Sequence, residues 1–404
     1  MWAGVLLIFG LFFFGSGNTG AVINYWESVT AQSTVVLGVI NAVCGASAAW
    51  ESARLRQAAI STWAPARSEL RIACEHLAPI ALLGLLGVLA SLLVFAPAGL
   101  LDVPGGPDVT VLGTAYVVIL AHIALGWLAG LRVPRLLGPA LMLIVGYFWG
   151  FWPAAISDPA WLRHLNIQGM TECCSIDQVP SPRSLAATVA FSAGIIVAVL
   201  ITSTTLRPGS RLLLSLIAFF TGLTVAVTAA MPLEFNGVQP RDRALLHCTG
   251  SKPEICLWPE QRPAADDFRR WTAEADNNLR AIGVTPAKKI EFSVVVPERN
   301  DVLAATAGSA LRLDIPSCAE QPYAEYPGDE AASVIYPWLV LTAGVTPDSL
   351  AWPAEAISLA QEVRKMPAAS QQAWLDRNMR SVRDCSVKPE LSPSAFAQAG
   401  KEKR

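Results

Sequence analysis

Charged residues are scarce in this chain of 404 residues. Only 15% of the residues are Asp, Glu, Lys or Arg, 53% are hydrophobic, and the mean hydropathy is +0.42. Soluble domains carry about 25% charged residues, so the composition excludes an ordinary soluble protein. The residues up to Met231 include 10 basic and 9 acidic side chains, which leaves 20 and 23 for the rest. Neither half is basic enough to predict a nucleic-acid partner.

The motifs of several enzyme classes are missing as well. The sequence contains no G-x-x-x-x-G-K-[ST] loop, no H-E-x-x-H and no G-x-S-x-G, and it has only four histidines. These absences remove the usual residues of ATPases, zinc peptidases and α/β-hydrolases. We therefore expect no catalytic residues, no cofactor and no bound metal. Any ATPase activity would belong to a partner subunit.

Seven apolar runs contain no charged residue. The first has 13 residues and the other six have 17–21, long enough for a helix to cross about 30 Å of hydrocarbon. The runs are Trp2–Phe14, Ser33–Trp50, Leu77–Ala96, Val111–Leu131, Leu136–Ile156, Leu185–Ile201 and Leu212–Met231. No basic residue precedes the short first run, which favours a retained helix over a cleaved signal peptide.

Arginine alternates between the loops that join these runs. The three loops that follow the second, fourth and sixth runs carry eight arginines in total. The intervening loops carry only Arg163 and Arg183. The eight are Arg54, Arg56, Arg67, Arg71, Arg132, Arg135, Arg207 and Arg211. Positive residues favour the cytoplasmic side. The pattern predicts about seven transmembrane helices in a bacterial plasma membrane lipid bilayer, with the N-terminus inside and the C-terminal domain outside.

Six of the eight cysteines fall on the predicted outer side, where disulfides form. Cys248 and Cys256 close a short loop with Gly and Pro and are the first candidate pair, and Cys318 with Cys385 is the second. Cys173 and Cys174 are adjacent and carry no clear assignment. A copper or zinc site with His164 and Met170 is the less favoured alternative for these two thiols.

The membrane region offers few polar side chains. His122 is the one clear ionisable residue within a run, and Asn41 is its polar companion in the second run. A buried ionisable residue can mark an ion pathway, but a neutral imidazole that joins two helices is the favoured interpretation. The stretch Gly45–Ala48 with His122 loosely resembles a rhomboid Ser–His dyad, although the two would lie at different depths.

The longest inner connection runs from Glu51 to His76. Its candidate coupling residues are Arg54, Arg56, Trp63, Arg67 and Arg71. One interpretation is an interfacial segment that docks on a cytosolic subunit. The other is a basic stripe attracted to anionic lipid.

The pattern changes after Met231 to that of a water-soluble fold. We assign 1–231 to a transmembrane bundle, 232–385 to a small α+β domain, and 386–404 to a disordered tail. An amphipathic helix is predicted from Ala264 to Ile282 and strands at 290–296 and 333–342. Two further helices are predicted at 359–366 and 375–385.

Three stretches carry a family resemblance. They are GASAAWESARLR at Gly45–Arg56, LAPIALLGLL at the third run, and LLHCTGSKPEICLWPE at Leu245–Glu260. Together they resemble permease-like membrane proteins of actinobacteria related to ABC-2-type exporters. The resemblance implies a membrane subunit that pairs with a cytosolic ATP-binding subunit, with two membrane halves per complex, and a coupling role for Glu51–His76. The seventh helix and the outer tail depart from the simplest exporter pattern.

Three hypotheses follow. The leading one is a permease-like subunit of an ATP-driven exporter, assembled as a homo- or heterodimer of membrane subunits. The second is a non-transporting membrane protein that displays an outer binding or sensing domain. An intramembrane or extracytoplasmic enzyme is the third, and the missing motifs weigh against it.

Overall fold

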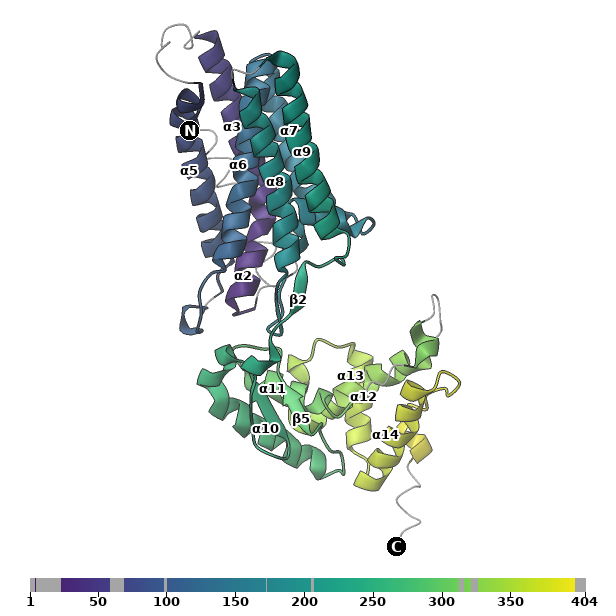
Figure 1. The fold of residues 1–404 in the computed structure, drawn as a ribbon. Coiled ribbons are helices and arrows are strands. Elements are labelled where there is room, and N and C mark those ends of the chain that lie inside the picture. Colours follow the sequence, from purple (N-terminus) through teal and green to yellow (C-terminus); the bar gives the residue numbers. More distant parts are fainter. Residues whose placement is uncertain are drawn as a thin grey trace. The chain divides into compact units, whose positions relative to one another are not determined.

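The fold was taken from a computed structural model that describes residue 4 and residues 23–58, 69–97, 100–171, 173–204, 207–311, 316–320 and 326–396. The chain divides into two compact units, residues 1–242 and 243–404 (Figure 1). Each unit is described by itself.

The first unit is a helical bundle. The helices among its described residues are α2 (Trp26–Gln32), α3 (Leu37–Gln57), α5 (Glu69–Phe95), α6 (Val109–Arg132), α7 (Leu137–Phe151), α8 (Pro182–Thr202) and α9 (Pro208–Ala230). Single turns of 3-10 helix join α2 to α3 at Ser33–Val36 and extend α7 at Trp152–Ala155. Among the described residues, six spans are long and apolar enough to cross a membrane. They confirm the second to seventh apolar runs as helices. The first run lies outside the described residues except for residue 4.

Local signals explain where several of these helices begin. The side chain of Asp108 accepts hydrogen bonds from the backbone N–H groups of Thr110 and Val111, at 2.8 and 3.2 Å, and so caps α6. Helices α8 and α9 each start with proline, at Pro182 and Pro208. Proline suits the first helical position because the N–H that it lacks has no partner there.

The span Trp26–Gln57, which contains α3, is the most buried of the six described spans. Small residues allow its neighbours to approach closely. A Cβ at Gly146 of α7 would lie 2.6 Å from the Cα of Ala42, and one at Gly126 of α6 would overlap the Gly45 carbonyl. Helices α8 and α9 meet in the same way at Gly194 and Gly222. The centre of the bundle is therefore filled by helix backbone.

The segment between α7 and α8 folds into a cap of short elements, Ala160–Leu165 and Gln168–Met170. Strand β1 (Gln178–Pro180) then pairs antiparallel with β2 (Val238–Pro240), which follows α9. This pairing ties the residues before α8 to the residues after α9.

The second unit is mainly helical, with a three-stranded sheet. Strands β3 (His247–Thr249) and β4 (Glu254–Leu257) are antiparallel, and β5 (Lys289–Glu291) lies parallel to β4. The helices are α10 (Ala265–Arg280), α11 (Arg299–Gly308), α12 (Pro327–Ala343), α13 (Ala354–Arg364) and α14 (Ala368–Arg383). The helix predicted at Ala264–Ile282 is confirmed as α10, and the two later helices as α13 and α14.

Two hydrophobic clusters form the core of the described part of this unit. The larger surrounds α12, where the rings of Trp338 and Trp374 are fully buried with centroids 5.5 Å apart. The smaller lies between the sheet and α10, where Phe268 and Phe292 have centroids 4.8 Å apart. Aromatic pairs of this kind bury a large apolar area.

Three expectations for the second unit differ from the structure. The segment 333–342 is helical rather than extended. It belongs to α12, which is buried on most of its sides, so the segment shows no polar face that would reveal a helical period. The strand expected at 290–296 is limited to Lys289–Glu291. Residues 386–396, expected to be disordered, pack on α14: the Trp374 indole donates to the Leu391 carbonyl at 3.1 Å, and Phe396 contacts the larger cluster.

Candidate functional site

The ends of three helices are fixed together at the arginine-rich end of the bundle. The guanidinium of Arg56, on α3, donates to the carbonyls of Leu131 and Val133 at 2.8 and 3.0 Å. These carbonyls lie at the end of α6, where backbone acceptors have no partner within the helix. Arg135 joins the start of α7 to α3: its guanidinium lies 4.4 Å from the Trp50 ring centroid and donates to the Gln57 side chain at 3.1 Å.

Ion pairs continue this surface onto α5. Arg54 donates to Glu51 within α3 at 2.9 Å, and the other oxygen of Glu51 lies 3.0 Å from His76 of α5. Arg71 pairs with Glu75 at 3.1 Å. The structure describes three of the five candidate coupling residues. They are Arg54, Arg56 and Arg71, and each forms a contact within this chain. Trp63 and Arg67 lie outside the described residues.

The two polar residues predicted inside the membrane do not form a pair. His122 is buried on α6, and its Nδ1 lies 2.9 Å from the Val118 carbonyl, one turn earlier in the same helix. Asn41 is buried on α3, and its side-chain oxygen has no hydrogen-bond partner in the described part of the chain. His122 lines a small cavity of about 110 Å³ together with Trp149 and Ser192. No feature of these residues indicates an ion pathway.

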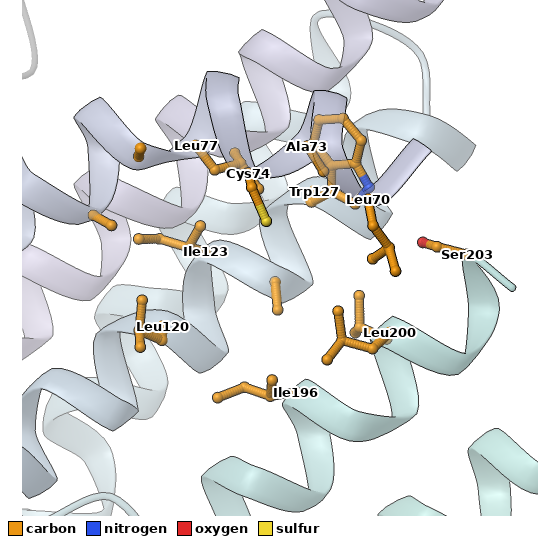
Figure 2. A pocket seen from close by; sticks show the side chains of 14 residues that line it. Leu70, Ala73, Cys74, Leu77, Leu120, Ile123, Trp127, Ile196, Leu200 and Ser203 are labelled. Carbon is orange, nitrogen blue, oxygen red and sulfur yellow. The ribbon is translucent and has the colours of Figure 1, made fainter. Parts of the chain in front are cut away.

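A larger apolar groove lies between α5, α6 and α8 (Figure 2). Its volume is about 310 Å³. Its lining side chains are aliphatic apart from Cys74, Trp127 and Ser203, and they are Leu70, Ala73, Leu77, Ala78 and Ala81 of α5, Leu120, Ile123 and Ala124 of α6, and Ile196, Val199 and Leu200 of α8. Sequence patterns could not predict this groove, because it is assembled from three helices that are distant in the chain.

The opposite end of the bundle carries the histidine and the adjacent cysteines for which a metal site was considered. Cys173 and Cys174 are buried and paired with each other. Both ring nitrogens of His164 are engaged, Nδ1 with the Ser184 hydroxyl and Nε2 with the Glu234 carbonyl, each at 2.8 Å. Burial lowers the pKa of His164. A ring with both nitrogens engaged does not fit the alternative of a copper or zinc ligand.

The second unit contains the two predicted cysteine pairs. Cys248 and Cys256 are direct cross-strand partners with Cα atoms 4.0 Å apart. Cys318 and Cys385 join the segment before α12 to the residue that follows α14 by two, with Cα atoms 6.5 Å apart. Glu254 places a carboxylate within 4.8 Å of the first pair. Because both sulfurs are engaged with each other there, they do not offer metal ligands.

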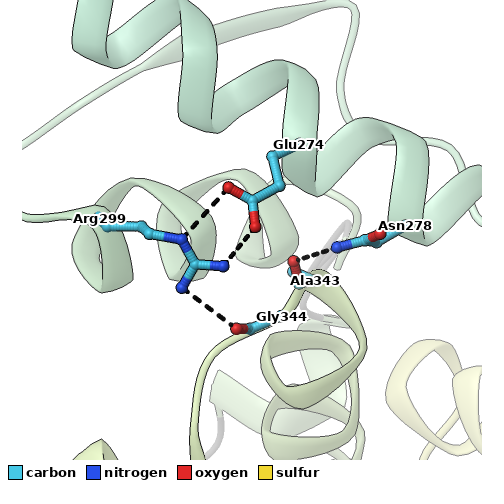
Figure 3. A network of polar contacts seen from close by, with 5 residues as sticks. All are labelled: Glu274, Asn278, Arg299, Ala343 and Gly344. Carbon is cyan, nitrogen blue, oxygen red and sulfur yellow. Dashed lines mark hydrogen bonds and ion pairs between the residues drawn. The ribbon is translucent and has the colours of Figure 1, made fainter.

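A polar network connects α10, α11 and the end of α12 (Figure 3). Arg299 forms a two-point ion pair with Glu274, with one contact at 3.2 Å, and also donates to the Gly344 carbonyl at 3.4 Å. Asn278 donates to the Ala343 carbonyl at 2.9 Å. Gly344 has φ of 112°, which favours glycine at this helix end. The network therefore serves to hold the end of α12 in place.

Comparison with known proteins gives one match, and it falls in the second unit. Residues 255–385 match the family model DUF7224, a domain of unknown function. The match begins in β4 and ends at Cys385, so it spans α10 to α14. No curated protein and no solved structure matches the chain. None of these comparisons supports the resemblance to ABC-2-type permeases, which stays a hypothesis.

Proposed function

We propose that this chain is a permease-like membrane subunit of an ATP-driven exporter, which works with a separate cytosolic ATP-binding subunit. The observation that supports the proposal is the cross-connected arginine-rich end. Arg56, Arg135 and Glu51 join α3 to α6, α7 and α5 there. A force applied by a partner at this end would pass to four helices at once.

The filled centre of the bundle favours an assembly of two membrane subunits. Helix α3 occupies the middle of the bundle, so a passage through one copy would require its close contacts with α6 and α7 to open. A passage between two copies requires no such opening. Helix α9 is the least buried of the six described spans. Its exposed leucines and Phe220 suit either lipid or a second copy.

The proposed orientation places the arginine-rich end in the cytoplasm and the second unit outside the plasma membrane. Two further features agree with it. The free cysteines, Cys44 and Cys74, belong to the bundle, and Cys74 lies near the arginine-rich end. The paired cysteines lie in the second unit and in the cap at the opposite end of the bundle, as an oxidising exterior would favour.

A second candidate is a non-transporting membrane protein that displays the second unit for binding or sensing. The same filled centre favours it, because a bundle without a passage serves well as a rigid anchor. This candidate needs no ATPase and predicts that changes at the arginine-rich end leave its activity intact.

The experiment is affinity purification of the tagged full-length chain in mild detergent, with mass spectrometry and an ATPase assay. The proposal predicts a stoichiometric ATP-binding partner. Arg54→Glu should release that partner, whereas Arg183→Glu, an exposed arginine at the other end of the bundle, should retain it. Melting temperatures of both variants close to that of the unchanged protein show that they remain folded. Purification without any ATP-binding partner would favour the second candidate.

A further inference from the structure

The groove between α5, α6 and α8 has the dimensions of one membrane leaflet. Its α5 wall runs from Leu70 to Ala81, which is about 16 Å at 1.5 Å per residue. This is about half of the 30 Å hydrocarbon thickness. The wall therefore has the length of one acyl chain within a leaflet.

The groove is apolar in depth and polar at one end. Figure 2 shows Leu120, Ile123 and Ile196 at one side of the view and Trp127, Leu70 and Ser203 at the other. The Trp127 indole N–H donates to no group among the described residues, although the side chain is only 9% exposed. The indole N–H itself is not fully enclosed, so it is accessible to an acceptor from outside the chain.

Positive charge borders this polar end. Arg211 donates to the carbonyls of Thr202 and Thr204, on either side of Ser203, at 3.4 and 3.3 Å. Arg71 lies between the lining residues Leu70 and Ala73 on α5, and its side chain stays largely exposed although it pairs with Glu75. Basic pockets between membrane helices attract anionic head groups. The groove thus has aliphatic walls, neutral hydrogen-bond donors at one end and arginines beside that end. A phospholipid with an anionic head group matches this order, because its acyl chain is apolar and its phosphate is an acceptor with negative charge.

We propose that this groove binds an anionic glycerophospholipid, with one acyl chain along the aliphatic walls and the phosphate beside Trp127, Ser203 and the two arginines. The site is independent of whether the chain transports anything. It also differs from general attraction of arginines to a charged surface, because it requires the groove itself.

The test uses the full-length protein in nanodiscs of phosphatidylcholine. A trace of phosphatidylglycerol with a diazirine in its acyl chain is added and photolysed, and labelled peptides are mapped by mass spectrometry. We expect labelling at lining residues such as Ala124 and Leu200, well above that given by phosphatidylcholine with the same diazirine chain. Leu93, 77% exposed in the other half of α5, reports the background labelling by bulk lipid.

Variants separate the groove from the charge. Arg71→Gln and Arg211→Gln should each reduce groove labelling about five-fold, whereas Arg132→Gln, at the same end but outside the lining, should change it less than two-fold. Ala124→Trp should fill the groove and abolish the labelling. Melting temperatures close to that of the unchanged protein identify the variants that remain folded.

Two outcomes overturn the proposal. Equal groove labelling by the two lipids would mean that the contact is not selective for an anionic head group. A groove that gives only protein–protein adducts, with another segment of the chain or a second copy, would mean that protein and not lipid occupies it.

Discussion

The contact between α3 and α6 gives the sharpest prediction for the bundle. A Cβ at Gly126 would overlap the carbonyl of Gly45 and would lie 3.0 Å from the Cβ of Ala48. The main obstacle is backbone, which cannot rotate away as a side chain can. Gly126→Ala should therefore force the two helices apart. Overpacking of this kind costs about 1–3 kcal/mol.

Gly113 of the same helix is the matched control, because a Cβ there meets nothing within 4 Å. Both substitutions change the helix propensity in the same direction, by up to about 1 kcal/mol. The difference between the two variants then isolates the cost of overlap, about 1–3 kcal/mol. For a unit of this size each kcal/mol corresponds to about 2–4 °C in melting temperature.

The assay is thermal denaturation in detergent with a dye that fluoresces on reaction with thiols. Cys44 is buried in α3 and reports unfolding of the bundle, and the exposed Cys74 is first replaced by Ser. We expect Gly126→Ala to melt below Gly113→Ala. If Gly126→Ala melts at the same temperature as Gly113→Ala or higher, the close approach of α3 and α6 is wrong.

Three further predictions concern the cysteine pairs, His164 and Arg299. Cys318→Ser should destabilise the second unit by about 4 kcal/mol and Cys248→Ser by about 2–3 kcal/mol. The costs differ because the cysteines of the two pairs are 67 and 8 residues apart in the chain. Equal melting temperatures of both variants and the unchanged protein, measured without reductant, would contradict the disulfides. Burial lowers the pKa of His164, so the stability it supports is present above about pH 6.5 and is lost as the pH falls. The melting temperature followed by tryptophan fluorescence should thus decline from pH 7 to 5, and His164→Gln should flatten that decline. Arg299→Lys keeps the charge but loses the two-point contact, and because the pair is partly exposed the cost should stay below about 1 kcal/mol; a urea titration that shows a larger loss would assign the network a greater role.

Prediction from the sequence was most accurate for the apolar runs, where hydrocarbon is the dominant solvent. Six long apolar runs without charge became six helices, because in hydrocarbon a helix is the structure that satisfies its own backbone. Prediction was least accurate inside the second unit. Residues 333–342 are apolar around Pro337, and a short apolar run shows no periodicity when it is buried on most of its sides. Length and flanking residues were the remaining signals, and proline pointed to an edge strand instead of a helix.

The sequence predicted individual residues of the candidate site but not the contacts that they make. Arg54, Arg56 and Arg71 follow from the alternation of charge between loops. Their partners do not, because the Arg56 contact to Leu131 joins residues 75 apart. The order at 386–396 was missed for the same reason: Asn378 binds the backbone of Glu390 through hydrogen bonds of 2.8 Å in both directions. Polarity of the tail predicted disorder, whereas a buried amide on α14 gives it a fixed partner.

The packing of the bundle limits where function can reside. Its centre is filled by α3, and the small residues there leave little space between backbones. His122 is hydrogen-bonded within its own helix and Asn41 is not joined to it. For the described residues we therefore expect recognition at surfaces: the arginine-rich end, the exposed face of α9, the groove beside α5, or the second unit. The exporter proposal requires both the arginine-rich end and the exposed face of α9. A lipid in the groove would stabilise α5 against α8 at the same end, so lipid composition and partner binding should then be coupled, since two ligands that favour one arrangement of helices favour each other.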